Sequence, residues 1–138
     1  MTLRTVHVHK QPKALRVFFL TEMWERYGFY VIQTLLILYL LHIFKMSDEM
    51  SYGVLGSITA LAYANSVLGG LIADRWIGHR TAVLLASVML AIGYCLIAVS
   101  YNLTLTYWAF ALITMGTGLF KPNICSLFGQ LYDEYDVR

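Results

Sequence analysis

Apolar residues in this 138-residue chain fall into four runs, each near the roughly 20 residues that an α-helix needs to cross a bilayer. Short polar or glycine-containing stretches separate the runs. The pattern predicts an all-α membrane protein with spans at Leu15–Leu41, Tyr52–Ala73, Thr81–Tyr101 and Thr106–Leu127. Because the connections are short, neighbouring helices should run antiparallel. The predicted organisation is a tail at 1–14, a four-helix segment at 15–132 and a short end at 133–138.

Lysine and arginine gather in alternate connections. They are frequent before the first span and after the second, whereas the other two connections are nearly free of them. The residues concerned are Arg4, Lys10, Lys13, Arg16, Arg75 and Arg80. Cytoplasmic loops carry an excess of Lys and Arg, so both termini are expected in the cytoplasm.

Composition agrees with a membrane protein and excludes several other classes. The chain is 59% hydrophobic and 13% charged, against the roughly 25% charged residues of a soluble domain. Cys95 and Cys125 lie inside apolar runs and do not suggest a disulfide framework. The four histidines are scattered, which predicts no metal site, and a net charge of +2 does not point to nucleic acid. No nucleophile with a base or phosphate-binding loop indicates an enzyme.

Three charges inside the first run are its most informative feature. Glu22, Glu25 and Arg26 would each oppose membrane insertion by about 2.5–3.5 kcal/mol if unpaired. On a helix, Glu22 and Arg26 share a polar face with Phe29, Tyr30 and Gln33, and Glu25 lies just beside it. This face is expected to line a water-filled cavity. Alternatively, Glu22 and Arg26 form a structural i, i+4 ion pair, which leaves Glu25 in need of a second cation or a proton.

The second run is rich in small residues. Gly53, Gly56, Gly69 and Gly70 favour close helix packing in a membrane. Tyr63 carries a hydroxyl in the middle of this run, where it either lines a cavity or bonds a neighbouring helix.

The fourth run contains Lys121 directly before Pro122. A proline inside a helix frees a backbone carbonyl and bends the helix. Lys121 either reaches the membrane surface or pairs with Glu22 or Glu25 across the first and fourth helices.

The connection after the second run, GGLIADRWIG at residues 69–78, resembles the cytoplasmic loop signature of the major facilitator superfamily. Gly78 gives the backbone freedom that a tight turn needs, and Asp74 lies at a helix end near basic residues. One interpretation is a charged gate at the cytoplasmic mouth, and the other is a solvated loop that only sets orientation. The residues of this candidate gate loop are Gly70, Asp74, Arg75, Gly78 and Arg80.

Together with this loop, the ExxER pattern at 22–26 and FKPN at 120–123 make the chain resemble the proton-dependent oligopeptide transporter family. The resemblance implies the first four helices of a major facilitator fold in the cell (inner) membrane. It also implies symport of di- and tripeptides with protons, with no other cofactor. The carried-over roles are proton coupling for Glu22, Glu25, Arg26 and Lys121, and substrate binding for Arg26, Tyr30, Gln33, Tyr63 and Lys121. Many relatives have arginine at the position of Gln33, so this residue bears on peptide selectivity.

Length is the main departure from that family, whose fold has at least twelve spans. The chain is therefore expected to be an amino-terminal fragment that needs the carboxy-terminal helices and is inactive alone. Two alternatives are a small dimeric four-helix transporter of cations or drugs that uses Glu22 or Glu25, and a non-transporting subunit that docks on a membrane partner.

Overall fold

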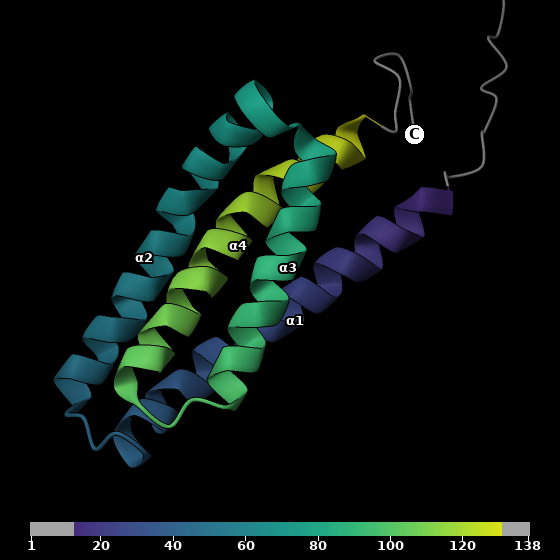
Figure 1. Ribbon diagram of the computed structural model, residues 1–138. Helices are drawn as coiled ribbons and strands as arrows, with labels where there is room; N and C mark the ends of the chain where they lie inside the picture. The colour runs from purple at the N-terminus through teal and green to yellow at the C-terminus, as the bar shows by residue number, and fades with distance from the viewer. Residues whose placement is uncertain (1–12, 131–138) are drawn as a thin grey trace, which may run out of the picture.

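The computed structural model describes residues 13–130, and this part of the chain is helical throughout apart from its short connections (Figure 1). The elements are α1 (Lys13–His42), α2 (Asp48–Ile72), the π-helical turn η1 (Ala73–Ile77), α3 (His79–Ala98) and α4 (Leu103–Gly129). This confirms the all-α prediction and the number of long helices. The predicted end at 133–138 and all but the last two residues of the predicted tail lie outside the described residues.

All four helices begin two to four residues before the predicted spans, and two of these starts have a side-chain cap. Ser47 caps α2, and its hydroxyl accepts a hydrogen bond from the Met50 amide at 3.4 Å. Asn102 caps α4 and accepts one from the Leu105 amide at 2.7 Å. Such caps satisfy amides that have no partner inside the helix, and acidic residues in the first turn of α2 complement the helix dipole.

Helix α4 lies between α2 and α3, and α1 crosses the bundle obliquely (Figure 1). One apolar cluster joins α3 to α4 through Leu90, Ile113 and Phe120. A second joins the C-terminal half of α1 to α4 through Leu36, Leu40 and Phe110. α4 is therefore the central helix of the described segment.

Glycine permits the close approach of α2 and α4. A β-carbon on Gly69 would collide with the backbone of Gly118, and one on Gly118 would lie 2.6 Å from the carbonyl carbon of Asn65. The prediction of close packing is thus confirmed at Gly69. Within residues 13–130 it finds no support at Gly53 and Gly56, because both residues lie on an exposed face of α2 and a β-carbon there would meet nothing within 4 Å.

Three segments of the described chain are long and apolar enough to cross a membrane: Asp48–Ile77, His79–Ala98 and Leu103–Gly129. Helix α1 has 30 residues, which is ample length, but its charged segment makes it less apolar than the other three. Its membrane crossing stays a prediction.

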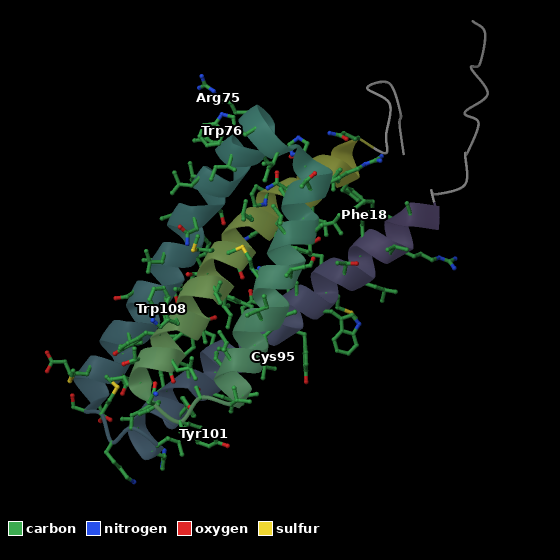
Figure 2. The ribbon with its side chains drawn as sticks, viewed as in Figure 1. Phe18, Arg75, Trp76, Cys95, Tyr101 and Trp108 are labelled. Atoms are coloured by element: carbon green, nitrogen blue, oxygen red, sulfur yellow. The ribbon has the colours of Figure 1, made fainter. Side chains whose placement is uncertain are left out.

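Exposed aromatic and basic side chains mark the two ends of the bundle. Figure 2 shows Arg75 and Trp76 at the end where α2 meets α3, and Tyr101 at the opposite end. Trp76 is 75% exposed and Tyr101 is 91% exposed. Such residues are typical of the two membrane–water interfaces.

Candidate functional site

The buried carboxylate of Glu25 is the centre of the candidate site. Glu25 is 8% exposed and lies on α1. The guanidinium of Arg26 binds it with two hydrogen bonds, from Nε to Oε2 at 2.5 Å and from Nη2 to Oε1 at 2.7 Å. A bidentate pair of this kind fixes the geometry of both groups and offsets part of the cost of burying them.

The structure differs from the alternative in which Arg26 pairs with Glu22. The i, i+4 spacing favoured Glu22, but Arg26 binds its sequence neighbour Glu25. Glu22 is exposed and lines a cavity of about 210 Å³ between the first half of α1 and the end of α4, beside Phe18 and Cys125. Burial explains why Arg26 binds Glu25 and not Glu22. Without Arg26, the buried carboxylate of Glu25 would have neither solvent nor a cation beside it.

A second partner of Glu25 comes from α4. The Thr117 hydroxyl donates a hydrogen bond to Oε1 of Glu25 at 3.3 Å, and Thr117 is 3% exposed. Sequence reasoning missed this residue. Its position one turn before Lys121 on the same helix face was the available signal.

Helix α3 packs on the same region of α1. A β-carbon on Gly28 would lie 3.1 Å from the hydroxyl oxygen of Tyr94. This hydroxyl is buried and has no hydrogen-bond partner within residues 13–130. Tyr94 was also missed, because one tyrosine in an otherwise apolar run carries little signal.

Lys121 does not pair with a carboxylate as expected. In the part of the chain that the structure describes, neither Glu22 nor Glu25 lies within ion-pair distance of its ammonium group. The Nζ atom instead lies 5.5 Å from the ring centroid of Tyr63 on α2. Tyr63 therefore contacts α4 through its ring, in a cation–π interaction with Lys121.

The other predicted pocket residues lie along α1. Gln33 donates a hydrogen bond from Nε2 to the Thr59 hydroxyl of α2 at 3.2 Å, one turn away from Tyr63. Tyr30 is exposed and packs edge-on against Phe29. Phe29 in turn lies beneath Arg26, whose guanidinium carbon is 5.1 Å from the ring centroid.

The candidate gate loop contains the π-helical turn η1, with Gly70 in the last turn of α2 and Arg80 in the first turn of α3. Gly78 ends η1 with φ 76° and ψ 151°, and its amide donates to the Ala73 carbonyl at 2.9 Å. The Oδ1 atom of Asp74 lies 3.5 Å from Nε2 of His79. Arg75 and Arg80 are exposed, and Gly70 packs against Pro122 of α4, since a β-carbon there would lie 3.6 Å from the proline.

Asn123, the last residue of FKPN, joins this loop to α4. Its Nδ2 donates to the carbonyls of Gly69 at 3.2 Å and Leu119 at 2.6 Å. Its Oδ1 lies 2.9 Å from Nδ1 of His79. Because an amide oxygen can only accept, Nδ1 of His79 is the donor in this bond. The sequence reasoning assigned no role to either residue.

Comparison with known proteins finds similar sequences in one family of transporters. The sequence model described as the POT family matches residues 80–138. Dipeptide and tripeptide permease A of Proteus mirabilis is 35% identical over 97% of this chain, and the permease A of Escherichia coli is 36% identical over the same share. The chain is similar to the POT family along nearly its whole length.

Solved structures of the POT family share the fold. A peptide transporter POT in complex with alafosfalin superposes with a TM-score of 0.89 at 30% identity over 98% of this chain. A POT family transporter in complex with 5-aminolevulinic acid gives 0.88 at 32% identity over 97%. With the three apolar helices, these matches make the chain a multi-pass inner-membrane protein of a transporter family. It spans about 28% of the length of these relatives.

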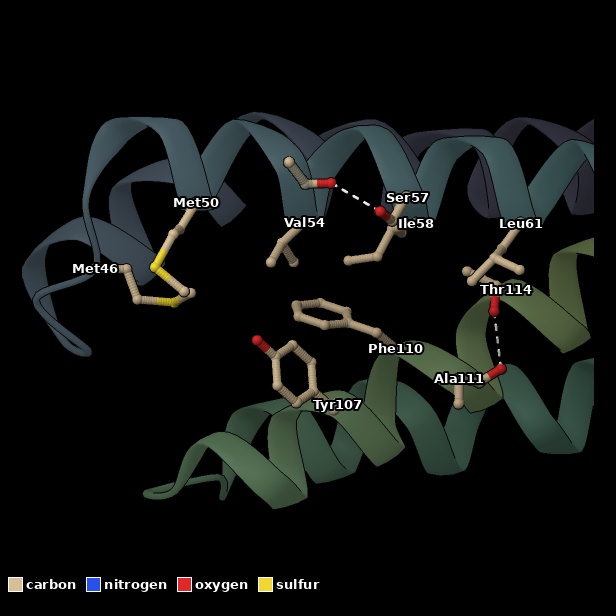
Figure 3. A pocket seen from close by; sticks show the side chains of 11 residues that line it. Met46, Met50, Val54, Ser57, Ile58, Leu61, Tyr107, Phe110, Ala111 and Thr114 are labelled. Carbon is tan, nitrogen blue, oxygen red and sulfur yellow. Dashed lines mark hydrogen bonds between the residues drawn. The ribbon is translucent and has the colours of Figure 1, made fainter.

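The described segment also has an apolar groove between α2 and α4, of about 440 Å³ (Figure 3). Figure 3 shows Met46 and Met50 at one end, Phe110 and Tyr107 along one wall, and Thr114 towards the other end. None of the predicted site residues lines this groove. The charged site and this groove are therefore separate features. Between residues 13 and 130, no group of three or more His, Cys, Asp or Glu side chains is arranged to hold a metal ion.

Proposed function

We propose that this chain is part of a proton-coupled symporter of di- and tripeptides, and that the Glu25–Arg26 pair is its proton-coupling site. The names of the curated relatives, which are dipeptide and tripeptide permeases, support the substrate class. A solved relative in complex with a thioalcohol-conjugated peptide supports it as well. This likeness favours peptide transport over the dimeric cation transporter and the docking subunit.

The buried position of Glu25 is the observation that carries the proposal. A carboxylate and a guanidinium removed from water are costly, and an apolar pair of similar volume is often as stable. Polar groups of this kind inside a membrane protein mark ion and proton pathways. Proton binding to Glu25 removes its negative charge and releases Arg26, so one proton changes the bonding of two groups.

Arg26 has the capacity to bind substrate as well. Its bonds to Glu25 use two of the five N–H donors of the guanidinium, and the others suit the carboxylate terminus of a peptide. Tyr30, Gln33 and Tyr63 are proposed to line the peptide pocket. Lys121, held over Tyr63 in this structure, is proposed to take a carboxylate partner in another state of the transport cycle.

The loop at Gly70, Asp74, Arg75, Gly78 and Arg80 is proposed as the cytoplasmic gate. Its bonds to α4 through Asn123 support this role, because movement of α4 would pull on the loop directly. Both termini are proposed to lie in the cytoplasm.

Uptake of a labelled dipeptide into proteoliposomes with an inward proton gradient tests the proposal. The protein used is the product of the whole reading frame that encodes this chain, here called the complete protein. Glu25→Gln should reduce gradient-driven uptake by about tenfold or more, the scale of losing a hydrogen bond to a charged group. Glu49→Gln, which changes an exposed carboxylate at the start of α2, is the matched control. Wild-type uptake by Glu25→Gln, or no uptake by the unmodified complete protein, would overturn the proposal.

A further inference from the structure

Thr117 is unusual among the Ser and Thr residues in the helices of residues 13–130, because its hydroxyl donates to a side chain on another helix. Hydroxyls of Ser and Thr within helices commonly donate back to a carbonyl of their own helix. Thr21, Thr34, Ser66, Ser87, Thr114 and Ser126 all do so here. The Thr117 hydroxyl instead leaves α4 and donates to Glu25 on α1.

This bond involves a buried donor and a buried acceptor. Thr117 is 3% exposed and Glu25 is 8% exposed. Oε1 of Glu25 receives both the Nη2 group of Arg26 and the Thr117 hydroxyl. Arg26 belongs to the same helix as Glu25, so it does not hold the carboxylate against a neighbour. Thr117 supplies the link from this carboxylate to α4.

The two states of Glu25 would use this link differently. An ionised carboxylate accepts the hydroxyl proton strongly, whereas a protonated one is a weaker acceptor. The bond between α1 and α4 is therefore strongest when Glu25 is charged and paired with Arg26. Lys121 lies one turn further along the same face of α4, so a shift between these helices would also move the lysine.

We propose that Thr117 is a positioning residue, which fixes the buried carboxylate of Glu25 against α4 and so links the charge on Glu25 to the contact between α1 and α4. As a role in coupling, this inference rests on the proposed function. The contact itself can be tested without any transport.

The first experiment measures the contact in the complete protein, reconstituted in lipid nanodiscs. The carboxylate infrared stretch of Glu25 is isolated as the difference between the unmodified protein and Glu25→Gln. Thr117→Val keeps the volume but removes the hydroxyl, and should shift this band. Thr117→Ser should restore it. Thr114→Val is the matched control, because Thr114 is 2% exposed and donates to the Ala111 carbonyl at 3.0 Å (Figure 3).

The second experiment measures coupling in proteoliposomes. Thr117→Val should lower gradient-driven dipeptide uptake by about tenfold, the scale set by losing one hydrogen bond to a charged group. Peptide counterflow, which needs no net proton movement, should stay close to that of the unmodified protein, because this exchange does not require the charge on Glu25 to change. A merely structural defect would lower both rates together. Thr117→Ser should recover gradient-driven uptake.

The outcomes separate this inference from the proposed function. An unchanged infrared band in Thr117→Val overturns the contact, and a shifted band with unchanged gradient-driven uptake overturns the coupling role. Equal loss of both transport rates also overturns it. If the complete protein transports no peptide, the proposed function fails while the infrared result still decides the contact. If Thr117→Val does not fold, Thr117→Ala replaces it, with the same expected shift.

Discussion

The crossing of α2 and α4 at Gly118 gives the sharpest stability prediction. In Gly118→Ala, the new methyl group would lie 2.6 Å from the carbonyl carbon and 2.8 Å from the carbonyl oxygen of Asn65. Carbon atoms in good contact are about 3.5–4.0 Å apart, so the helices must separate by about 1 Å. The obstacle is backbone, which cannot rotate away as a side chain can.

The magnitude follows from two opposing effects. Overpacking of a tight interface costs about 1–3 kcal/mol, and the upper end applies to Gly118→Ala because the backbone is fixed. Alanine in place of a helical glycine returns about 0.5–1 kcal/mol. The free energy of unfolding should therefore fall by about 2 kcal/mol. Gly56→Ala has no such obstacle, since nothing lies within 4 Å of the new methyl group, and should raise the free energy of unfolding.

The assay is reversible unfolding of the 138-residue chain in detergent micelles, followed by circular dichroism. The test is whether Gly118→Ala lowers the free energy of unfolding while Gly56→Ala raises it, in addition to the size of each change. Gly69→Ala should weaken the crossing from the other side, because its methyl group would collide with the backbone of Gly118. The double variant Gly69→Ala/Gly118→Ala should lose less free energy of unfolding than the two single variants added together, since helices that have already separated accommodate both methyl groups. Equal, stabilising effects of Gly118→Ala and Gly56→Ala would refute the reasoning.

Two further predictions concern the gate loop and use the same unfolding assay. Asn123→Leu removes the bonds to the Gly69 carbonyl and to His79, and should lower the free energy of unfolding by about 2 kcal/mol. A loss no larger than that of Ser126→Ala, whose hydroxyl bonds its own helix, would contradict this. Gly78→Ala forces a side chain into a backbone region that is nearly reserved for glycine, and should cost about 1–3 kcal/mol. Gly129→Ala is its control, and equal stability of the two variants would count against strain at Gly78.

Much of the fold follows from apolar length alone. Four runs near 20 residues predict four helices, and the structure places a helix over each. The helix starts could not be set this way, because the capping residues Ser47 and Asn102 are polar and lie outside the apolar runs. Nor could the π-helical turn at Ala73–Ile77, since one extra residue per turn leaves no clear mark in the pattern.

The sequence predicts residues of the candidate site, but not the hydrogen bonds that they make. Glu25 and Arg26 stand out because charges inside an apolar run are rare. Their bidentate contact does not follow from spacing, because adjacent residues on a helix point about 100° apart and i, i+4 pairs are the usual neighbours. Long side chains and burial overrode that preference. Thr117 lies 92 residues from its partner, and its position one turn before Lys121 is the one feature that sets it apart from the other helix hydroxyls in the sequence.

Three residues within two turns of α4 join it to every other helix. Thr117 bonds Glu25 on α1, Lys121 lies over Tyr63 on α2, and Asn123 binds both the end of α2 and the first residue of α3. The charged site on α1 and the gate loop make no direct bond to one another among residues 13–130. A change in charge at the site therefore has a physical route to the gate through this segment of α4. Because Pro122 removes one backbone hydrogen bond there, the segment is also where α4 deforms most easily.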